Sequence, residues 1–458
     1  MATPANPVSA VVAAPASFRV VLSNRNFTYL CFAQLLSQIA QNVINYAVLV
    51  KVEELSHSTT QVAVTIVSFT LPAVIFGPIA GVFVDRMDKK AILVYTNLLR
   101  AVATLGFVFL GGSLPAIYGI LFVSSAINQL FSPAEGASIP MLVKRDQLLN
   151  AMSLFNVTFY SAVVLGFIII APAAIKFASL NAAFFVTVAM YAAAAGLCAI
   201  LPARFSRLRP VPRAAQDVAG HAWHVDNHWQ FFQELREGLV YIFANAELTA
   251  AIIQLTLIST LLLIIGEMAP GFTNRVLDLT AEDTAYVFLP MGLGLIAGMI
   301  STGRLTARIP KQLLTRISVT AIGVLMFGIG VSPPLSRLGY RISSFADTDS
   351  HIQAANWLLG LDLFLFLLLG LAFAYVLVPA QTLVQELAGD EVRGRVLSIQ
   401  LMISSAFTII PLLLFGGLAD AYGITTVLIA MGVLIALPFG WYLRKALVEY
   451  HAGLKRSA

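Results

Sequence analysis

A succession of about a dozen apolar stretches, each of roughly 20 residues, constrains the fold of this chain more than any other feature. A helix rises about 1.5 Å per residue, so about 20 apolar residues cross the ~30 Å hydrocarbon core of a bilayer. Charged residues make up only 11% of the 458, too few to cover a water-exposed globule of this size. The sequence therefore predicts an all-α polytopic membrane protein.

We predict twelve transmembrane helices, arranged as two six-helix halves that are pseudo-repeats of each other. The predicted spans are 27–50, 60–82, 91–112, 115–134, 150–174, 180–201, 246–268, 283–303, 312–332, 356–378, 396–416 and 422–443. The longest polar interval, 202–245, separates an N-terminal half, 27–201, from a C-terminal half, 246–443. An N-terminal tail, 1–26, and a C-terminal tail, 444–458, flank the two halves.

Lysine and arginine are unevenly distributed between the two sides of the predicted spans. One side carries only Lys51, Lys176, Arg275, Arg337 and Arg341, whereas most other basic residues fall in the loops and tails of the opposite side. By the positive-inside rule, both termini are expected in the cytoplasm. The interval 202–245 is then cytoplasmic too, and its last part, 228–245, suits a helix lying on the membrane surface.

Short motifs indicate that the halves are distant repeats. The run from Ser132 to Glu135 after the fourth span resembles the run from Val378 to Gln381 after the tenth. Asp85-Arg86 after the second span corresponds to Gly303-Arg304 after the eighth. The two offsets differ because residues 333–355 form an unusually long predicted loop in the second half.

Polar residues recur along single faces of several spans. In the first span Gln34, Gln38, Gln41 and Asn45 lie within a narrow arc, since successive helical residues are about 100° apart. Amides are costly against lipid, so this face is predicted to line a wet cavity or to hydrogen-bond a neighbouring helix. The full set of candidate cavity residues is Gln34, Gln38, Gln41, Asn45, Tyr118, Ser125, Gln129, Asn156, Tyr160, Gln254, Gln400 and Ser404.

Few ionisable residues fall inside the spans, and each needs a reason because a charge at the bilayer centre costs about 2.5–3.5 kcal/mol on insertion scales. Arg100 is near the middle of the third span, Asp362 is near the outer end of the tenth, and Glu267 closes the seventh. We treat these three as candidates for substrate binding or proton coupling. The alternative is that Arg100 is structurally paired and that the two acids are interfacial.

The loop between the second and third spans combines a glycine, acids and a basic cluster from Gly81 to Lys90. Asp85 can end one helix and cap the next, and Arg86 can pair with a carboxylate such as Glu135. Such a cluster would lock the cytoplasmic side when the two halves meet there. The alternative is that the basic residues only determine orientation.

This loop resembles the loop 2–3 signature of the major facilitator superfamily of transporters, with Gly81, Asp85, Arg86 and Lys90 at the matching positions. The resemblance implies two six-helix halves that alternate access to a site between them. The second-half copy, Gly303-Arg304, lacks the acid.

Two further segments resemble the macrolide-efflux and enterobactin-exporter group of bacterial carriers: residues 132–143 with 148–151, and residues 379–386 with 391–396. The lysophospholipid transporters share a looser form of the pattern. The resemblance implies a carrier of a bacterial inner membrane. Where some relatives have an acid in the first span this chain has Gln41, which argues against proton coupling through that span.

We therefore expect a secondary active transporter that exports an amphipathic small molecule by alternating access. Its expected partners are a small-molecule or lipid substrate and membrane lipids, with protons as a candidate coupling ion. The alternatives are a lysophospholipid or other lipid carrier, and a membrane scaffold or sensor that does not transport. No Walker A loop is present, and we expect no enzyme activity, cofactor, metal or nucleic-acid partner. Cys31 and Cys198 are both expected to be buried free thiols.

Overall fold

The computed structural model describes residues 21–144, 147–202, 228–280, 283–343, 349–388 and 393–457, and this part of the chain is almost entirely helical. The N-terminal half comprises α2 (Arg25–Ser56), α3 (Thr59–Arg86), α4 (Lys89–Leu110), α5 (Leu114–Leu142), α6 (Leu148–Val163), η2 (Val164–Ile170), α7 (Ala171–Phe177) and α8 (Leu180–Ile200). The C-terminal half comprises α10 (His228–Ala244), α11 (Ala246–Gly271), η4 (Phe272–Val276), α12 (Thr284–Thr306), α13 (Lys311–Ser343), α14 (Asp349–Leu387), α15 (Arg393–Tyr422) and α16 (Ile424–Ser457).

Within the described residues, ten helices are long and apolar enough to cross a bilayer. Two more helices occupy the places of the first and twelfth predicted spans. These are α2, which carries the amide face, and the shorter apolar segment Ile424–Gly440 of α16. The predicted helical membrane fold is thus confirmed, and a count of twelve spans stays a prediction.

Short polar residues set where the first helices begin. The Asn24 side chain accepts from the backbone N–H groups of Asn26 and Phe27 at the start of α2, and Ser58 caps α3 in the same way. The cap of α4 is Asp88, which accepts from Ala91. The predicted cap, Asp85, is instead inside α3, because that helix continues to Arg86.

Several helices extend beyond the predicted spans. The seventh span runs through η4 to Val276 rather than ending at 268, so Glu267 is inside the span and does not close it. The predicted loop 333–355 is wrong, since α13 continues to Ser343 and α14 starts at Asp349. A hydropathy pattern locates only the residues that lie in the hydrocarbon core of the bilayer. The helix itself can continue beyond that core, because its backbone hydrogen bonds do not depend on apolar side chains.

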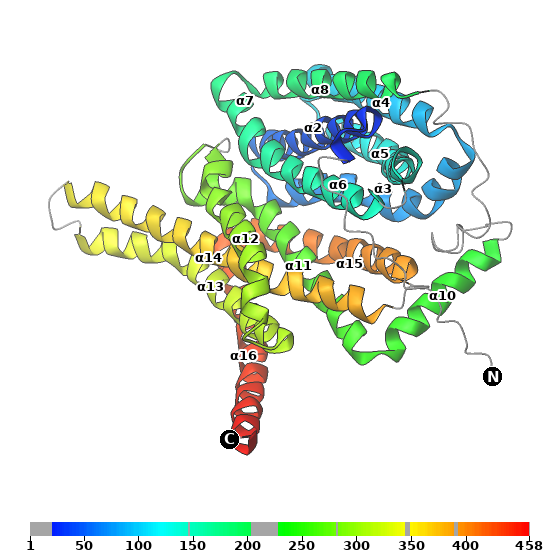
Figure 1. The fold of residues 1–458 in the computed structure, drawn as a ribbon. Coiled ribbons are helices and arrows are strands. Elements are labelled where there is room, and N and C mark those ends of the chain that lie inside the picture. Colours follow the sequence, from blue (N-terminus) through cyan, green and yellow to red (C-terminus); the bar gives the residue numbers. More distant parts are fainter. Residues whose placement is uncertain are drawn as a thin grey trace, which may run out of the picture.

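Figure 1 shows the two halves as separate bundles, with α11 and α15 of the C-terminal half next to the N-terminal half. One end of the molecule carries the α2–α3 turn at His57 and the α15–α16 turn at Gly423, and we call it the closed end. The other end, where α2 begins and α16 finishes, is the terminal end.

The apolar core differs between these two ends. At the closed end, one core contains residues of both halves, for example Ile44 and Ile66 with Ile264 and Phe373. At the terminal end each half has a core of its own: Phe27, Leu93 and Phe131 belong to the N-terminal one, and Leu248, Val384 and Ile399 to the C-terminal one. In the described residues the halves are therefore joined by a common core at one end only.

The helix α10 occupies the end of the polar interval, at the place predicted for a surface helix. Its Ile242 is buried in the C-terminal core of the terminal end, and the Tyr241 hydroxyl donates to the Leu387 carbonyl. The helix is therefore docked on the C-terminal half. Residues 203–227, which include His221 and His224, are outside the described residues. Both cysteines are buried and free, as predicted.

Candidate interdomain gate

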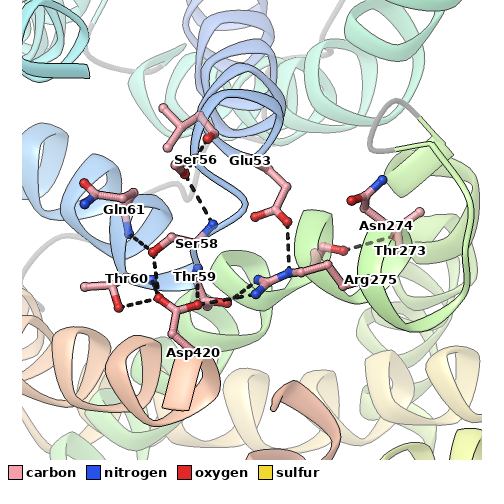
Figure 2. Close-up of polar contacts among 12 residues, drawn as sticks. Glu53, Ser56, Ser58, Thr59, Thr60, Gln61, Thr273, Asn274, Arg275 and Asp420 are labelled. Carbon is pink, nitrogen blue, oxygen red and sulfur yellow. Dashed lines mark hydrogen bonds and ion pairs between the residues drawn. The ribbon is translucent and has the colours of Figure 1, made fainter. Parts of the chain in front are cut away.

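Asp420, near the end of α15, joins the two halves at the closed end. Its carboxylate accepts hydrogen bonds from the Ser58 hydroxyl (2.6 Å), the Thr59 backbone N–H (2.7 Å) and both the N–H (2.9 Å) and hydroxyl (2.6 Å) of Thr60. The first N–H groups of a helix lack partners within the helix and carry its positive dipole end. The start of α3 is thus an anion site that the C-terminal half occupies (Figure 2).

Arg275 makes the second connection across the same boundary. Its side chain donates to the Thr59 hydroxyl at 2.5 Å and to Asp420 Oδ1 at 3.4 Å. Its Nε is 3.1 Å from Glu53 Oε1 at the end of α2, an ion pair whose N–H direction does not meet hydrogen-bond geometry. Arg275 therefore neutralises two carboxylates, one from each half (Figure 2).

The backbone explains how Arg275 reaches this position. The last turn of its span is a π-helical segment, η4, which turns residues out of the register of α11. Gly271 lies one turn earlier, and a Cβ there would collide with the Arg275 guanidinium and crowd Ile424 at 2.9 Å. The absence of a side chain at Gly271 leaves room for the guanidinium beside Asp420.

A second pair of contacts lies beside this network. Lys176 Nζ, at the end of α7, is 2.7 Å from Asp283 Oδ1 at the start of α12, and the Ala285 N–H donates to the Tyr46 hydroxyl at 3.0 Å. Partial burial alone would raise the pKa of Asp283, but hydrogen bonds from Lys176 and Thr280 outweigh it and lower the pKa. This carboxylate is therefore ionised across the neutral range.

The helices α3 and α15 approach closely beneath the polar network. A Cβ at Gly416 would be 3.1 Å from the Ala63 Cβ and 3.3 Å from the Thr59 carbonyl oxygen, and it would collide with the Glu267 carboxylate. Glu267 itself is fully buried. We call the set Glu53, Ser58, Thr59, Thr60, Arg275 and Asp420, with the Lys176–Asp283 pair, the interdomain gate.

Arg100 lies in the interior of the N-terminal half and makes no contact with the gate. Its guanidinium is fully buried and donates to Ser37 (2.7 Å), Asn97 (2.9 Å) and Asn128 (2.9 Å). It also stacks on the rings of Phe131 and Tyr191, at 4.4 Å and 4.7 Å from their centroids. Neutral oxygen acceptors thus take three hydrogen bonds from the guanidinium, and two aromatic faces cover the cation.

The amide face of α2 is divided between two environments. Gln34 is buried and bonds Thr158 and the Phe155 carbonyl, which makes it a helix contact. Gln38, Gln41 and Asn45 are half-buried. Gln41 donates to Asn45 at 3.0 Å and accepts from the Tyr191 hydroxyl at 3.1 Å.

The polar residues of α5 mostly contact α3. Tyr118 donates to Gln61 at 2.6 Å, Ser125 donates to the Phe69 carbonyl at 2.5 Å, and Gln129 donates to the Ser125 carbonyl within its own helix. The side chains of Asn156 and Tyr160 are outside the described residues.

Hydroxyl pairs connect α11 and α15. Thr256 bonds Ser404 at 3.0 Å and Thr260 bonds Thr408 at 2.8 Å, so Ser404 belongs to a helix contact in this conformation. Gln400 is buried one turn before Ser404, and Gln254 is half-buried. Asp362 is buried between α14 and α13 and accepts a short hydrogen bond from Ser332.

The predicted cytoplasmic lock lies at the terminal end. Gly81, Asp85 and Arg86 are in α3, but beyond their place in this helix they are outside the described residues. Lys90 donates to the Leu201 carbonyl at 2.6 Å, and Glu135 is 3% exposed inside the N-terminal half. Among the described side chains, no group of three metal-binding residues occurs.

Sequence reasoning missed Glu53, Ser58–Thr60 and Asp420, because acids and hydroxyls at the ends of spans look like ordinary interfacial residues. Two signals were available. Ser58-Thr59-Thr60 is a strong helix start, and Asp420 follows the pair Gly416-Gly417, which allows close helix approach. Neither signal reveals that the two segments, 360 residues apart, lie against each other.

Comparison with known proteins agrees with this architecture. The chain is 25% identical over 321 residues to the uncharacterised MFS-type transporter YkuC of Bacillus subtilis, covering 68% of this chain and 71% of that one. It is 23% identical to macrolide efflux protein A of Streptococcus pyogenes, covering 88% and 91% of the two chains. The crystal structure of the nucleoside transporter NupG superposes with a TM-score of 0.65 at 14% identity, over 92% of this chain and 99% of that one.

The two helical bundles, joined at one end by a common core and a polar gate, agree with a family model that covers most of the chain. That model, of the Major Facilitator Superfamily, matches residues 30–410. The chain belongs to the Major Facilitator Superfamily.

Proposed function

We propose that this protein is a secondary carrier that exports amphipathic small molecules by alternating access. The observation that carries the proposal is closure at one end only, where the halves share a core and the gate, while each half has its own core at the terminal end. Alternating access needs a contact that breaks at one end while another forms at the opposite end. A few polar side chains around one carboxylate suit such a reversible contact.

The orientation proposed from the basic residues puts the closed end outside. Both termini are then cytoplasmic, and the structure corresponds to the state that is open to the cytoplasm, from which an exporter loads its substrate. Similarity to macrolide efflux protein A over 88% of this chain supports export as the direction.

The substrate path is proposed to follow the half-buried polar faces that the halves contribute. Gln38, Gln41 and Asn45 of α2, Gln129 of α5 and Gln254 of α11 are half-buried in this conformation. Neutral amides suit a bulky amphipathic compound better than a small ion, because they can solvate its polar groups without fixing a charge. When the terminal end closes, Asp85 and Arg86 would lock the halves there.

A transport assay in proteoliposomes tests this function. Purified protein should accumulate a labelled macrolide, or another amphipathic compound from a panel, against its gradient when a pH difference is imposed. Asp85→Asn should abolish the accumulation at unchanged expression. Movement of labelled lysophospholipid between leaflets, without movement of any soluble compound, would instead identify a lipid carrier. If neither class moves, the protein is a membrane scaffold or sensor and the proposal is wrong.

A further inference from the structure

Arg100 is a buried cation that is surrounded by oxygen atoms of neutral side chains. A guanidinium can only donate hydrogen bonds, so each neighbour must turn an oxygen toward it. The acceptors are Ser37 Oγ at 2.7 Å, Asn97 Oδ1 at 2.9 Å and Asn128 Oδ1 at 2.9 Å. Glu135 interacts electrostatically with Arg100, but in the described structure the two form no ion pair. The positive charge therefore orients the dipoles of the side chains around it.

A chain of hydrogen bonds leads from this cation to the amide face of α2. The Arg100 guanidinium is 4.7 Å from the centroid of the Tyr191 ring and also interacts with the Tyr191 hydroxyl. The cation favours the arrangement in which this hydroxyl turns its oxygen inward and donates its proton away. The donated hydrogen bond goes to Gln41 Oε1 at 3.1 Å, and Gln41 Nε2 in turn donates to Asn45 Oδ1 at 3.0 Å. The chain thus ends in the N–H groups of Asn45.

The direction of this chain decides what the amide face can bind. An amide side chain that is free to rotate can present either its oxygen or its N–H groups. Here the oxygens of Gln41 and Asn45 are both engaged, and among the described residues Asn45 Nδ2 has no acceptor. Dipoles that point the same way along a chain strengthen one another. Gln41 and Asn45 therefore present N–H groups, which favour an oxygen acceptor and disfavour a cation.

Both amides are at the place where the two halves would enclose a substrate. Gln41 and Asn45 are half-buried, and an amide that faces lipid is unfavourable, so their exposed parts are expected to face the proposed path. Ile44 and Tyr46, next to Asn45, belong to the core that the halves share at the closed end. In carriers of this plan the substrate binds near the bilayer centre, between the halves. The two amides thus line the inner end of the path, just below the shared core.

We propose that Gln41 and Asn45 bind a carboxylate or carbonyl oxygen of the substrate, and that Arg100 orients them for this task through Tyr191. The preferred substrate is an amphipathic carboxylic acid in its anionic form, followed by a neutral ester, whereas a cationic amine is disfavoured. Arg100 and Tyr191 are fully buried and act as positioning residues. This inference rests on the proposed function, whose substrate class it narrows.

Equilibrium binding to the purified full-length protein tests this selectivity. The protein is held in nanodiscs of phosphatidylcholine, and empty nanodiscs give the background. The labelled probes share one aromatic ring system: naphthylacetate, its methyl ester and naphthylethylamine. The unchanged protein should bind the carboxylate about tenfold more tightly than the amine, with the ester between them, because a charged acceptor strengthens each hydrogen bond. Equal or tighter binding of the amine, or no binding of the carboxylate, would contradict the proposal.

Two substitutions test the chain itself. Asn45→Asp replaces the terminal N–H groups by a carboxylate and should reverse the order, so that the amine binds more tightly than the naphthylacetate. Tyr191→Phe removes the hydroxyl that fixes Gln41, so both amides can rotate and the ratio of the two affinities should fall several-fold. If Tyr191 only fills space, this ratio stays at the parent value. Such a result would remove the orienting role.

Two matched variants serve as controls. Tyr375→Phe removes a tyrosine hydroxyl that bonds Ser301 at 2.9 Å in the C-terminal half. Glu386→Gln changes the net charge at an exposed acid that pairs with Lys311. Both should keep the parent ratio of affinities. An Asn45→Asp protein that binds the three probes like the parent would overturn the inference. Selective binding of the carboxylate without export of any compound would instead reject the proposed function and leave the binding site in place.

Discussion

At the scale of single residues, one carboxylate connects the two halves. Asp420 accepts four hydrogen bonds from three consecutive residues at the start of α3, two of them from backbone N–H groups. Hydrogen bonds to an ionised acceptor contribute about 1.5–3 kcal/mol each when buried, and less here because Asp420 is a quarter exposed. Arg275 fixes the same carboxylate from the C-terminal half, so the gate depends on correct charge as well as shape.

We predict that Asp420→Asn opens the closed end. The amide keeps the size of the side chain but loses the charge and presents N–H groups to other donors. A cysteine replacing Thr65, which is 1% exposed on α3 behind the gate, reports the opening by its labelling rate with an impermeant thiol reagent. The rate should rise several-fold relative to the same reporter in the unchanged gate. With Glu386→Gln as the control it should not change, and an equal rate in Asp420→Asn would show that the carboxylate does not hold the end closed.

At the scale of helices, the gate depends on the close approach of α3 and α15. Gly416 is the point of contact, since any side chain there meets Ala63, the Thr59 carbonyl and Glu267 together. The next residue, Gly417, has no neighbour within 4 Å of an added Cβ. Two adjacent glycines of one helix thus differ completely in their surroundings.

Gly416→Ala should therefore favour the open form of this end, whereas Gly417→Ala should not. Adding a methyl group to a packed contact costs about 1–3 kcal/mol, which α15 can relieve by moving away from α3. Spectroscopic distances between the halves should shift toward the longer population in the first variant and match the parent in the second. The same distances in both variants would mean that the helices adjust locally and that the contact is not critical.

The helices could be predicted from the sequence because each contains a continuous run of about 20 mainly apolar residues. Their ends were harder: Asp349 and Ser343 belong to helices that continue beyond the apolar residues. The residues of the candidate site could be predicted from the sequence only in part. Glu267 was recognisable as a coupling candidate at the predicted end of a span, but its burial was not predicted. Its setting depends on Gly416 and Ala63, and contacts between distant segments cannot be read from local composition.

At the scale of the whole molecule, the apolar cores define a conformation in which the two halves are in contact at one end and separate at the other. Ile44 and Ile264 belong to a core common to both halves, whereas Phe27 and Leu248 belong to separate cores at the other end. Packed cores are bistable and are not continuously deformable, so the halves are expected to rotate as rigid bodies about the closed end. Which compartment this state faces depends on the orientation of the chain in the membrane.

The distribution of basic residues predicts that the closed end faces outward and that the termini are cytoplasmic. Cysteine labelling in intact cells tests this in a background in which Cys31 and Cys198 are replaced by alanine. An impermeant maleimide should label Tyr422→Cys, at the closed end, and should spare Met87→Cys, which is 48% exposed at the terminal end. After permeabilisation both should react. If Met87→Cys reacts in intact cells while Tyr422→Cys does not, the chain is inserted the other way, and the structure would be the state that an importer, not an exporter, uses for loading.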